Sequence, residues 1–138
     1  MPSSIFELTS DLSVLNVSAS QKSVKAASNA DTVLTAAECV EGIVTMTPAT
    51  TDKLVTTPTG ADLKTYFGGQ LEIGTSFELT IVNVASATRA ITLTAAASGI
   101  TLGGAAAMAT VAAATSATYV FYCTAVGTPA FTVYRKGG

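Results

Sequence analysis

The chain has 138 residues, of which 7 are Lys or Arg, 9 are Asp or Glu and none is His. Its net charge of -2 is scattered, without a Lys/Arg stripe that could neutralise a row of phosphates, so we expect no nucleic-acid partner. Only 12% of the residues are charged, whereas soluble domains carry about 25%. This composition predicts that part of the surface is buried against other chains, in a homo-oligomer.

The first 30 residues are rich in serine and differ from the rest of the chain. Seven large apolar side chains occur there without a neighbouring segment that obviously pairs with them, namely Ile5, Phe6, Leu8, Leu12, Val14, Leu15 and Val17. At about 25 cal/mol per Å² of apolar area, even half burial of these side chains is worth several kcal/mol. We therefore predict an extended N-terminal arm over residues 1–30, with these seven residues as the candidate interface, and a β-sandwich domain over residues 31–138. The alternative is a frayed terminus.

No export signal or membrane span is indicated. Residues 1–6 lack a basic segment and an apolar core, so we expect a protein that is not secreted by that route. The alanine-rich residues 103–117 are too few and too weakly apolar to cross a bilayer, and we expect no membrane partner.

From residue 31 onward, short β-branched runs alternate with turn residues. Residues 32–35, 43–47 and 53–56 are predicted strands, and Pro48 and Pro58 end the second and third because proline cannot donate to a strand ladder. Such dense turn signals are typical of a β-sandwich.

Residues 60–67 form the one helix that we expect. Thr59 precedes them as a cap, Asp62 lies near the positive end of the helix, and Gly68 is suited to a left-handed exit. The apolar residues Leu63, Tyr66 and Phe67 share one helical face, which is predicted to plug one end of the sandwich.

Residues 76–83 and 91–94 are predicted to form a hairpin, because two alternating runs flank a small polar turn. One face of each run is apolar and the other is rich in threonine. A brief strand follows at 98–104, and residues 105–114 are expected to be a loop or β-connection, with a helix as the alternative. Residues 117–124 and 130–135 close the fold as a strand pair, giving about eight strands and one helix.

Nothing in the chain points to catalysis. Without histidine, a Ser–His or Cys–His pair is impossible, and only Glu38 and Glu41 are carboxylates close in sequence, at positions expected to be solvated. Cys39 and Cys123 lie in apolar, β-like surroundings and are expected to be small buried side chains. The aromatic residues of 119–122 are expected to pack in the core or across strands. We therefore predict no enzyme activity, no catalytic residue, no cofactor and no metal.

Several segments resemble a group of small structural proteins from tailed bacteriophages and large DNA viruses. The similarity lies in residues 32–42 (TVLTAAECVEG), 56–62 (TTPTGAD), 73–83 (IGTSFELTIVN), 92–94 (TLT), 99–102 (GITL) and 130–135 (AFTVYR). It spans about residues 31–136, and the arm lies outside it. The resemblance implies an antiparallel jelly-roll sandwich, commonly trimeric, that decorates or cements a capsid.

The resemblance makes a virion structural protein the first hypothesis for function. Such a subunit would be made in the host cytoplasm and would bind the major capsid protein on the capsid surface as a homo-oligomer, with the arm on a neighbour's sheet edge or along the capsid. A tail-fibre or spike domain that recognises a host glycan is the alternative. A third possibility is a monomeric cellular β-sandwich binding module.

Overall fold

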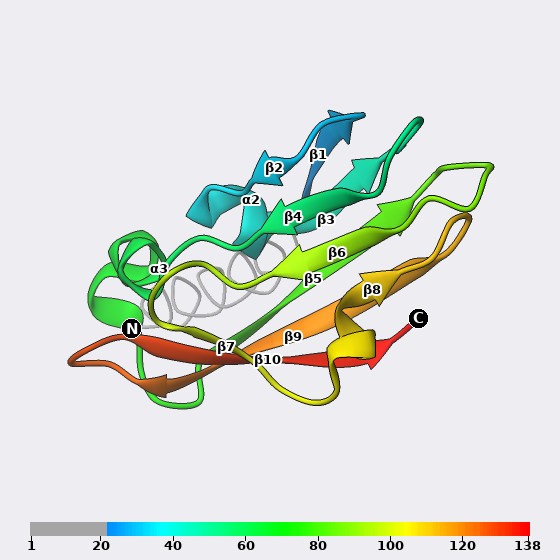
Figure 1. Ribbon diagram of the computed structural model, residues 1–138. Coiled ribbons are helices and arrows are strands. Elements are labelled where there is room, and N and C mark those ends of the chain that lie inside the picture. Colours follow the sequence, from blue (N-terminus) through cyan, green and yellow to red (C-terminus); the bar gives the residue numbers. More distant parts are fainter. Residues whose placement is uncertain (1–21) are drawn as a thin grey trace, which may run out of the picture.

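A computed structural model describes residues 22–138 (Figure 1). In this part of the chain, ten strands form a six-stranded sheet, here sheet A, and a four-stranded sheet, sheet B. Side chains from both sheets meet in one hydrophobic core. The prediction of a two-sheet β-sandwich is therefore confirmed, although residues 22–138 contain two short α-helices instead of one.

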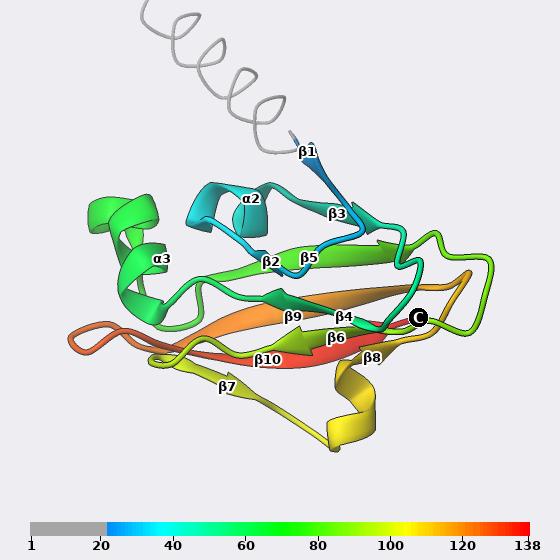
Figure 2. The same ribbon diagram turned by 45° about the horizontal axis from the view of Figure 1, so that its top comes forward.

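The strands follow one another in space in an order that differs from their order in the chain (Figure 2). Sheet A contains, in spatial order, β1 (Ser23–Ser28), β3 (Gly42–Met46), β5 (Ser76–Asn83), β9 (Ser116–Ala125), β10 (Ala130–Gly137) and β7 (Ile100–Leu102). Sheet B contains β2 (Thr32–Val33), β4 (Lys53–Thr56), β6 (Ile91–Thr94) and β8 (Thr110–Val111). The α-helices are α2 (Ala36–Glu41) and α3 (Gly60–Phe67), and the 3-10 turns are η1 (Gly68–Gln70) and η2 (Ala106–Ala109).

The chain crosses from one sheet to the other after every strand from β1 to β8. From β1 to β6, strands that are neighbours within a sheet are therefore two apart in the chain, and they run in the same direction. The pairs β1–β3, β3–β5, β2–β4, β4–β6 and β7–β10 are parallel, whereas β5–β9, β6–β8 and β9–β10 are antiparallel. The antiparallel arrangement expected for these sheets is thus wrong for five of the eight pairings.

The predicted hairpin of residues 76–83 and 91–94 is also wrong, because β5 belongs to sheet A and β6 to sheet B. The buried side chain of Asn83 directs this crossing. Its amide donates to the carbonyl oxygens of Arg89 (2.8 Å) and Val111 (3.0 Å), and its own oxygen accepts from the amide of Ala85 (3.0 Å). All the polar groups of Asn83 are thereby paired, and the turn is held between the sheets instead of folding back within one.

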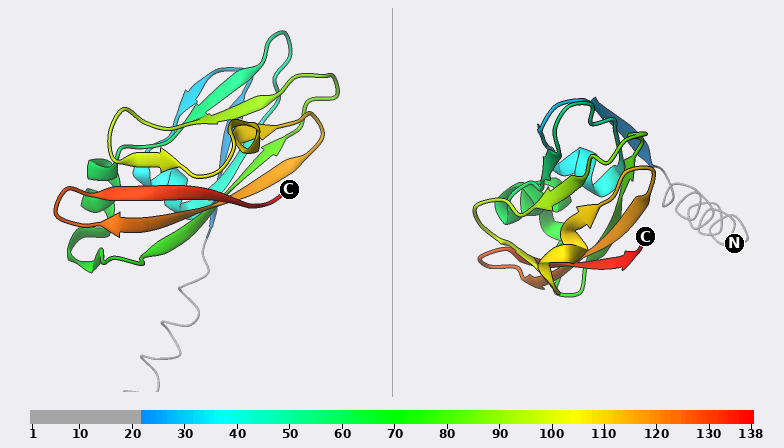
Figure 3. Two further views of the ribbon diagram at one scale, coloured as in Figure 1. Left: turned by 60° about the horizontal axis from the view of Figure 1, so that its bottom comes forward. Right: turned by 45° about the vertical axis from the view of Figure 1, so that its right-hand side comes forward.

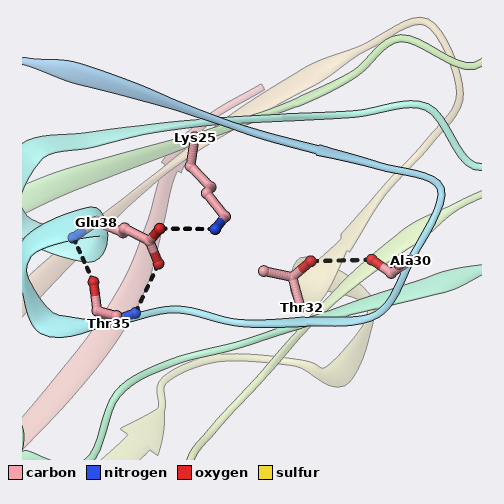
Figure 4. A network of polar contacts seen from close by, with 5 residues as sticks. All are labelled: Lys25, Ala30, Thr32, Thr35 and Glu38. Atoms are coloured by element: carbon pink, nitrogen blue, oxygen red, sulfur yellow. Dashed lines mark hydrogen bonds and ion pairs between the residues drawn. The ribbon is translucent and has the colours of Figure 1, made fainter.

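Helix α2 was not expected, since residues 32–35 were predicted to be a strand and β2 ends at Val33. The helix begins with a capping box: the amide of Glu38 donates to Thr35 Oγ1 (3.2 Å), and the amide of Thr35 donates to Glu38 Oε1 (3.0 Å) (Figure 4). Cys39 therefore lies on a helix and not in β-like surroundings, but its predicted burial is confirmed.

Helix α3 has the predicted bounds and the predicted cap, with Thr59 Oγ1 accepting from the amide of Asp62 at 3.1 Å. Leu63 is fully buried and Phe67 packs on the core, so this face plugs the end of the sandwich, while Tyr66 is exposed. Gly68 leaves the helix with a φ of 60° and a ψ of -136°, which lies outside the left-handed helical region that we expected.

The C-terminal strands are the part closest to the prediction. β9 and β10 form the expected antiparallel pair and lie side by side along sheet A (Figure 3). On their inner faces, Phe121 stacks on Phe77 with ring centroids 4.7 Å apart. The alanine-rich residues 105–114 contain the short turn η2 followed by β8, so the β-connection preferred over a helix is largely confirmed.

The seven apolar residues of the predicted arm lie outside the described residues. The described end of that segment contains β1, which pairs with β3 at the edge of sheet A.

Candidate interaction surfaces

Each carboxylate with a described contact holds the fold together. Asp31 accepts a hydrogen bond from the amide of Leu54, and Asp52 accepts one from the amide of Ala90, both at 2.9 Å. Glu38 caps α2 and forms a 2.9 Å ion pair with Lys25. The hydrogen bonds that Glu38 accepts from Lys25 and from the Thr35 amide lower the pKa of its carboxyl group. Within residues 22–138, no cluster of three or more His, Cys, Asp or Glu could hold a metal ion.

The two cysteines are free and buried, as predicted. Burial raises the pKa of the Cys39 thiol, because the charged thiolate would lose its hydration in the apolar interior. Both side chains therefore act as small core groups. None of the helices in the described part of the chain is long and apolar enough to cross a membrane.

The outward side of sheet A is the most extensive candidate surface. Strand alternation and the pairing registers place on this face Val24, Ala26, Ile43, Thr45, Ser76, Glu78, Thr80, Val82, Thr101, Ser116, Thr118, Val120, Tyr122, Thr124, Thr132, Tyr134 and Lys136. We call this set the outer face. Most of its members are threonine, serine or β-branched apolar residues, and Val24, Tyr122 and Tyr134 are respectively 61%, 43% and 53% exposed.

The charges of the outer face neutralise each other. Lys136 Nζ lies 2.7 Å from Glu78 Oε2, and the hydrogen bond between them lowers the pKa of Glu78. Lys22 Nζ approaches the backbone oxygen of Glu78 at 3.5 Å. Elsewhere on the face, polar side chains satisfy one another, as Thr80 and Thr118 do through a 3.0 Å hydrogen bond between their hydroxyl oxygens. The surface is therefore broad, uncharged over most of its area and rigidly held.

A second candidate is a cavity of about 280 Å³ at the opposite end of sheet A from β1. Its walls come from β6, β7, β9, β10 and the segment around η2, and comprise Leu93, Leu102, Gly103, Gly104, Ala105, Ala106, Met108, Ala109, Tyr119, Val133 and Arg135. This lining is mostly apolar. In Figure 1, η2 lies beside the end of β10. Its residues Ala106, Met108 and Ala109 form one wall of the cavity.

The polar groups of this cavity are already paired with the wall. The hydroxyl of Tyr119 donates to the carbonyl oxygen of Met108 at 2.9 Å. Arg135 Nη1 donates to the carbonyl oxygens of Met108 (3.3 Å) and Thr110 (2.8 Å). Burial of Tyr119 raises the pKa of its hydroxyl, which stays a donor at neutral pH. These bonds hold η2 over the cavity and leave an apolar interior.

Comparisons with protein-family models, with curated proteins and with solved structures found no match.

Sequence reasoning recognised the threonine-rich side of residues 76–83, but it missed that six strands join to form the outer face. Glu38 and Glu41, the carboxylates that stood closest in sequence, lie together on α2. Tyr119 and Phe121 are core residues as expected, but Tyr122 points outward. The signal was present, since a residue next to the buried Phe121 in a strand must point to the other side of the sheet.

Proposed function

We propose that this protein is a virion structural protein, a capsid decoration subunit that binds as a homo-oligomer to the major capsid protein and stabilises the shell. The outer face of sheet A carries this proposal. It offers exposed aromatic and β-branched side chains on a rigid sheet, with its two charges paired to each other. Such a surface loses little on desolvation when a protein partner covers it.

The size of the outer face supports the proposal. Six strands at about 4.8 Å spacing, with the eight residues of β5 at about 3.3 Å each, give roughly 24 by 26 Å, or about 600 Å². A standard protein interface buries about 800 Å² on each partner. The outer face and its rim are therefore of the size that one specific contact requires.

The arrangement of β1 favours contact through the face and disfavours contact through the strand edge. Val24 points outward and is exposed, while its neighbour Lys25 points inward and pairs with Glu38. A charge directed inward on an edge strand is a common device against edge-to-edge pairing. Val24, which is exposed on the outward side of β1, is the kind of apolar residue expected on a surface that a protein partner covers.

Occupancy on particles tests the function. The full chain carrying both Tyr122→Ser and Tyr134→Ser is mixed with particles of the virus that encodes this protein. The particles are prepared without the native subunit, and bound protein is measured after sedimentation. We expect binding to fall by at least about tenfold, since tyrosines that become buried in an interface are typical hot spots. Tyr66→Ser is the matched control, because Tyr66 is as exposed as Tyr122, at 43%, but lies on α3. Wild-type protein that fails to bind particles would remove the proposal.

The trimeric state and the position on the capsid surface belong to the same proposal and derive from the sequence resemblance. The five parallel strand pairs disfavour the antiparallel jelly-roll topology that the resemblance implies. Native mass spectrometry of the full chain measures the oligomer directly, and a monomer at micromolar concentration would contradict the proposed assembly.

The fibre or spike domain remains the second candidate, because Tyr122 and Tyr134 stand exposed on adjacent strands among threonines. Aromatic rings beside hydroxyl groups can hold a sugar as well as a protein. A glycan array probed with the full chain distinguishes the two functions: glycan binding without particle binding favours the fibre domain.

A further inference from the structure

We propose that the cavity beside η2 receives Phe6 and Leu8 from the arm of a neighbouring copy of this chain. This inference rests on the proposed homo-oligomer and deepens it by naming the contact that joins the copies.

The chemistry of the cavity favours an apolar occupant. Its two polar groups, the hydroxyl of Tyr119 and Nη1 of Arg135, already donate to carbonyl oxygens of the wall. An anionic ligand would have to take Arg135 away from Thr110 and Met108, which would release η2. An apolar side chain needs no such exchange and gains from the burial of its own surface.

The volume of the cavity fits side chains better than a single small ligand. An apolar cavity of roughly 150 Å³ is enough to bind benzene. The 280 Å³ found here therefore accommodates a phenyl ring together with a branched aliphatic group. Phe6 and Leu8 are two residues apart, so in an extended segment they point to the same side and can enter one cavity together.

Two glycines shape the opening of the cavity. The Cα of Gly103 packs so closely on Tyr134 that an added Cβ would lie 2.7 Å from the ring, and at Gly104 an added Cβ would lie 2.7 Å from Met108 Sδ. Gly104 also has a φ of +92°, a conformation that residues with side chains rarely adopt. The segment from Gly103 to Met108 is thus folded tightly against the end of the sandwich, and Met108 is 40% exposed.

The position of the arm favours exchange between copies. The described chain begins at Lys22, next to β1 at one edge of sheet A, and the cavity lies beyond β10 at the other edge. If the β1 edge of sheet A in one copy faces the β7 edge of sheet A in the next copy, the arm of the first copy meets the cavity of the second directly. Such a head-to-tail contact closes into a ring when its rotation allows. The 16 residues from Phe6 to Lys22 can span up to roughly 50 Å, so reach does not limit the contact.

Disulfide trapping tests this placement in the full chain. One protein carries Phe6→Cys and a second carries Met108→Cys; the two are mixed, exchanged and mildly oxidised, and covalent dimers are measured on a non-reducing gel. Because Cys39 and Cys123 are buried, wild-type protein gives the background. A docked arm holds the two thiols at about millimolar effective concentration, so at micromolar protein we expect about tenfold more dimer than from the control mixture.

The control mixture replaces Met108→Cys with Ile73→Cys. Ile73 is an apolar residue that is 68% exposed, lies before β5 and does not line the cavity. Equal dimer yields from the two mixtures would overturn the inference. So would a cross-link found only within single chains when Phe6→Cys and Met108→Cys are combined in one protein.

Native mass spectrometry separates this inference from the function on which it rests. An oligomer without the trapped dimer would remove the arm contact and leave the decoration function standing. A monomer would remove both.

Discussion

The two faces of sheet A are built from the same strands but are organised differently. The inner face holds the aromatic core, in which Phe121 is fully buried and stacks on Phe77. On the outer face, Tyr122 is the next residue of β9 and remains 43% exposed, among threonines and short apolar residues. The inner face therefore stabilises the monomer, whereas the outer face keeps its aromatic side chains accessible, as the proposed contact with another protein requires.

The largest expected effect separates these faces at two adjacent residues. Phe121→Ala leaves a large cavity in the core and should lower the free energy of unfolding by about 3–5 kcal/mol. Tyr122→Ala should lower it by less than about 1 kcal/mol, because its side chain is half exposed. Chemical denaturation of both variants measures the difference. Comparable losses would mean that the outer face also supports the monomer fold.

A second test concerns the close contact between Gly99 and Gly60, the first residue of α3, at the end of the sandwich that α3 covers. Gly99 has a φ of +79°, and an added Cβ would lie 2.7 Å from the carbonyl oxygen of Pro129 and 2.8 Å from the Cα of Gly60. Gly99→Ala should therefore destabilise the protein by roughly 1–3 kcal/mol. Gly69→Ala is the control, since its added Cβ meets nothing within 4 Å. Thermal unfolding of the two variants should differ clearly, and equal midpoints would show that the helix end can move away.

These elements also show how far the sequence alone could go. The pair β9–β10 and helix α3 are local structures, so alternation, turn residues and the cap at Thr59 were sufficient to predict them. The crossing from β5 to β6 was mistaken for a hairpin, because its cause is Asn83 bonding to Val111, 28 residues away. No local pattern reveals such a partner.

Helix α2 is a different kind of failure, since the signal was available. Thr35 and Glu38 have the spacing of a capping box, but the β-branched residues before them suggested that the strand continued. The candidate surfaces were harder to predict. Alternation places Tyr122 outward, but the cavity joins five elements that are brought together only by the strand order.

The capping box gives the third prediction, on the helix that covers the inner side of β1. Thr35→Ala removes the acceptor of the Glu38 amide and should cost about 1 kcal/mol of unfolding free energy. Thr32→Ala is the control, because Thr32 Oγ1 donates to the nearby carbonyl oxygen of Ala30 and is not linked to the capping box (Figure 4). Its expected change is within about 0.5 kcal/mol. If denaturant midpoints fall equally for both, the cap does not determine the stability of α2.

The smallest expected effect compares the ion pairs of the two faces. On the inner side, Lys25 lowers the pKa of Glu38, so this pair stabilises the fold above the unfolded pKa of about 4.3. The stabilisation is lost as the pH falls through the lower folded value. Because both side chains are partly exposed, we expect less than about 1 kcal/mol from the pair. Lys25→Met should therefore lower stability at pH 6 and have little effect at pH 3, as measured by urea unfolding at both values.

Lys136→Met is the matched control, because it breaks the ion pair between Lys136 and Glu78 on the outer face. The side chains of Lys136 and Glu78 are 61% and 45% exposed, respectively. Water and salt screen this pair more strongly, so its removal should change the pH dependence less than Lys25→Met does. Its larger consequence is expected on binding, since Glu78 would then bring an unpaired charge into a covered surface. A Lys136→Met variant that binds particles as well as wild type would place the contact away from this part of the outer face.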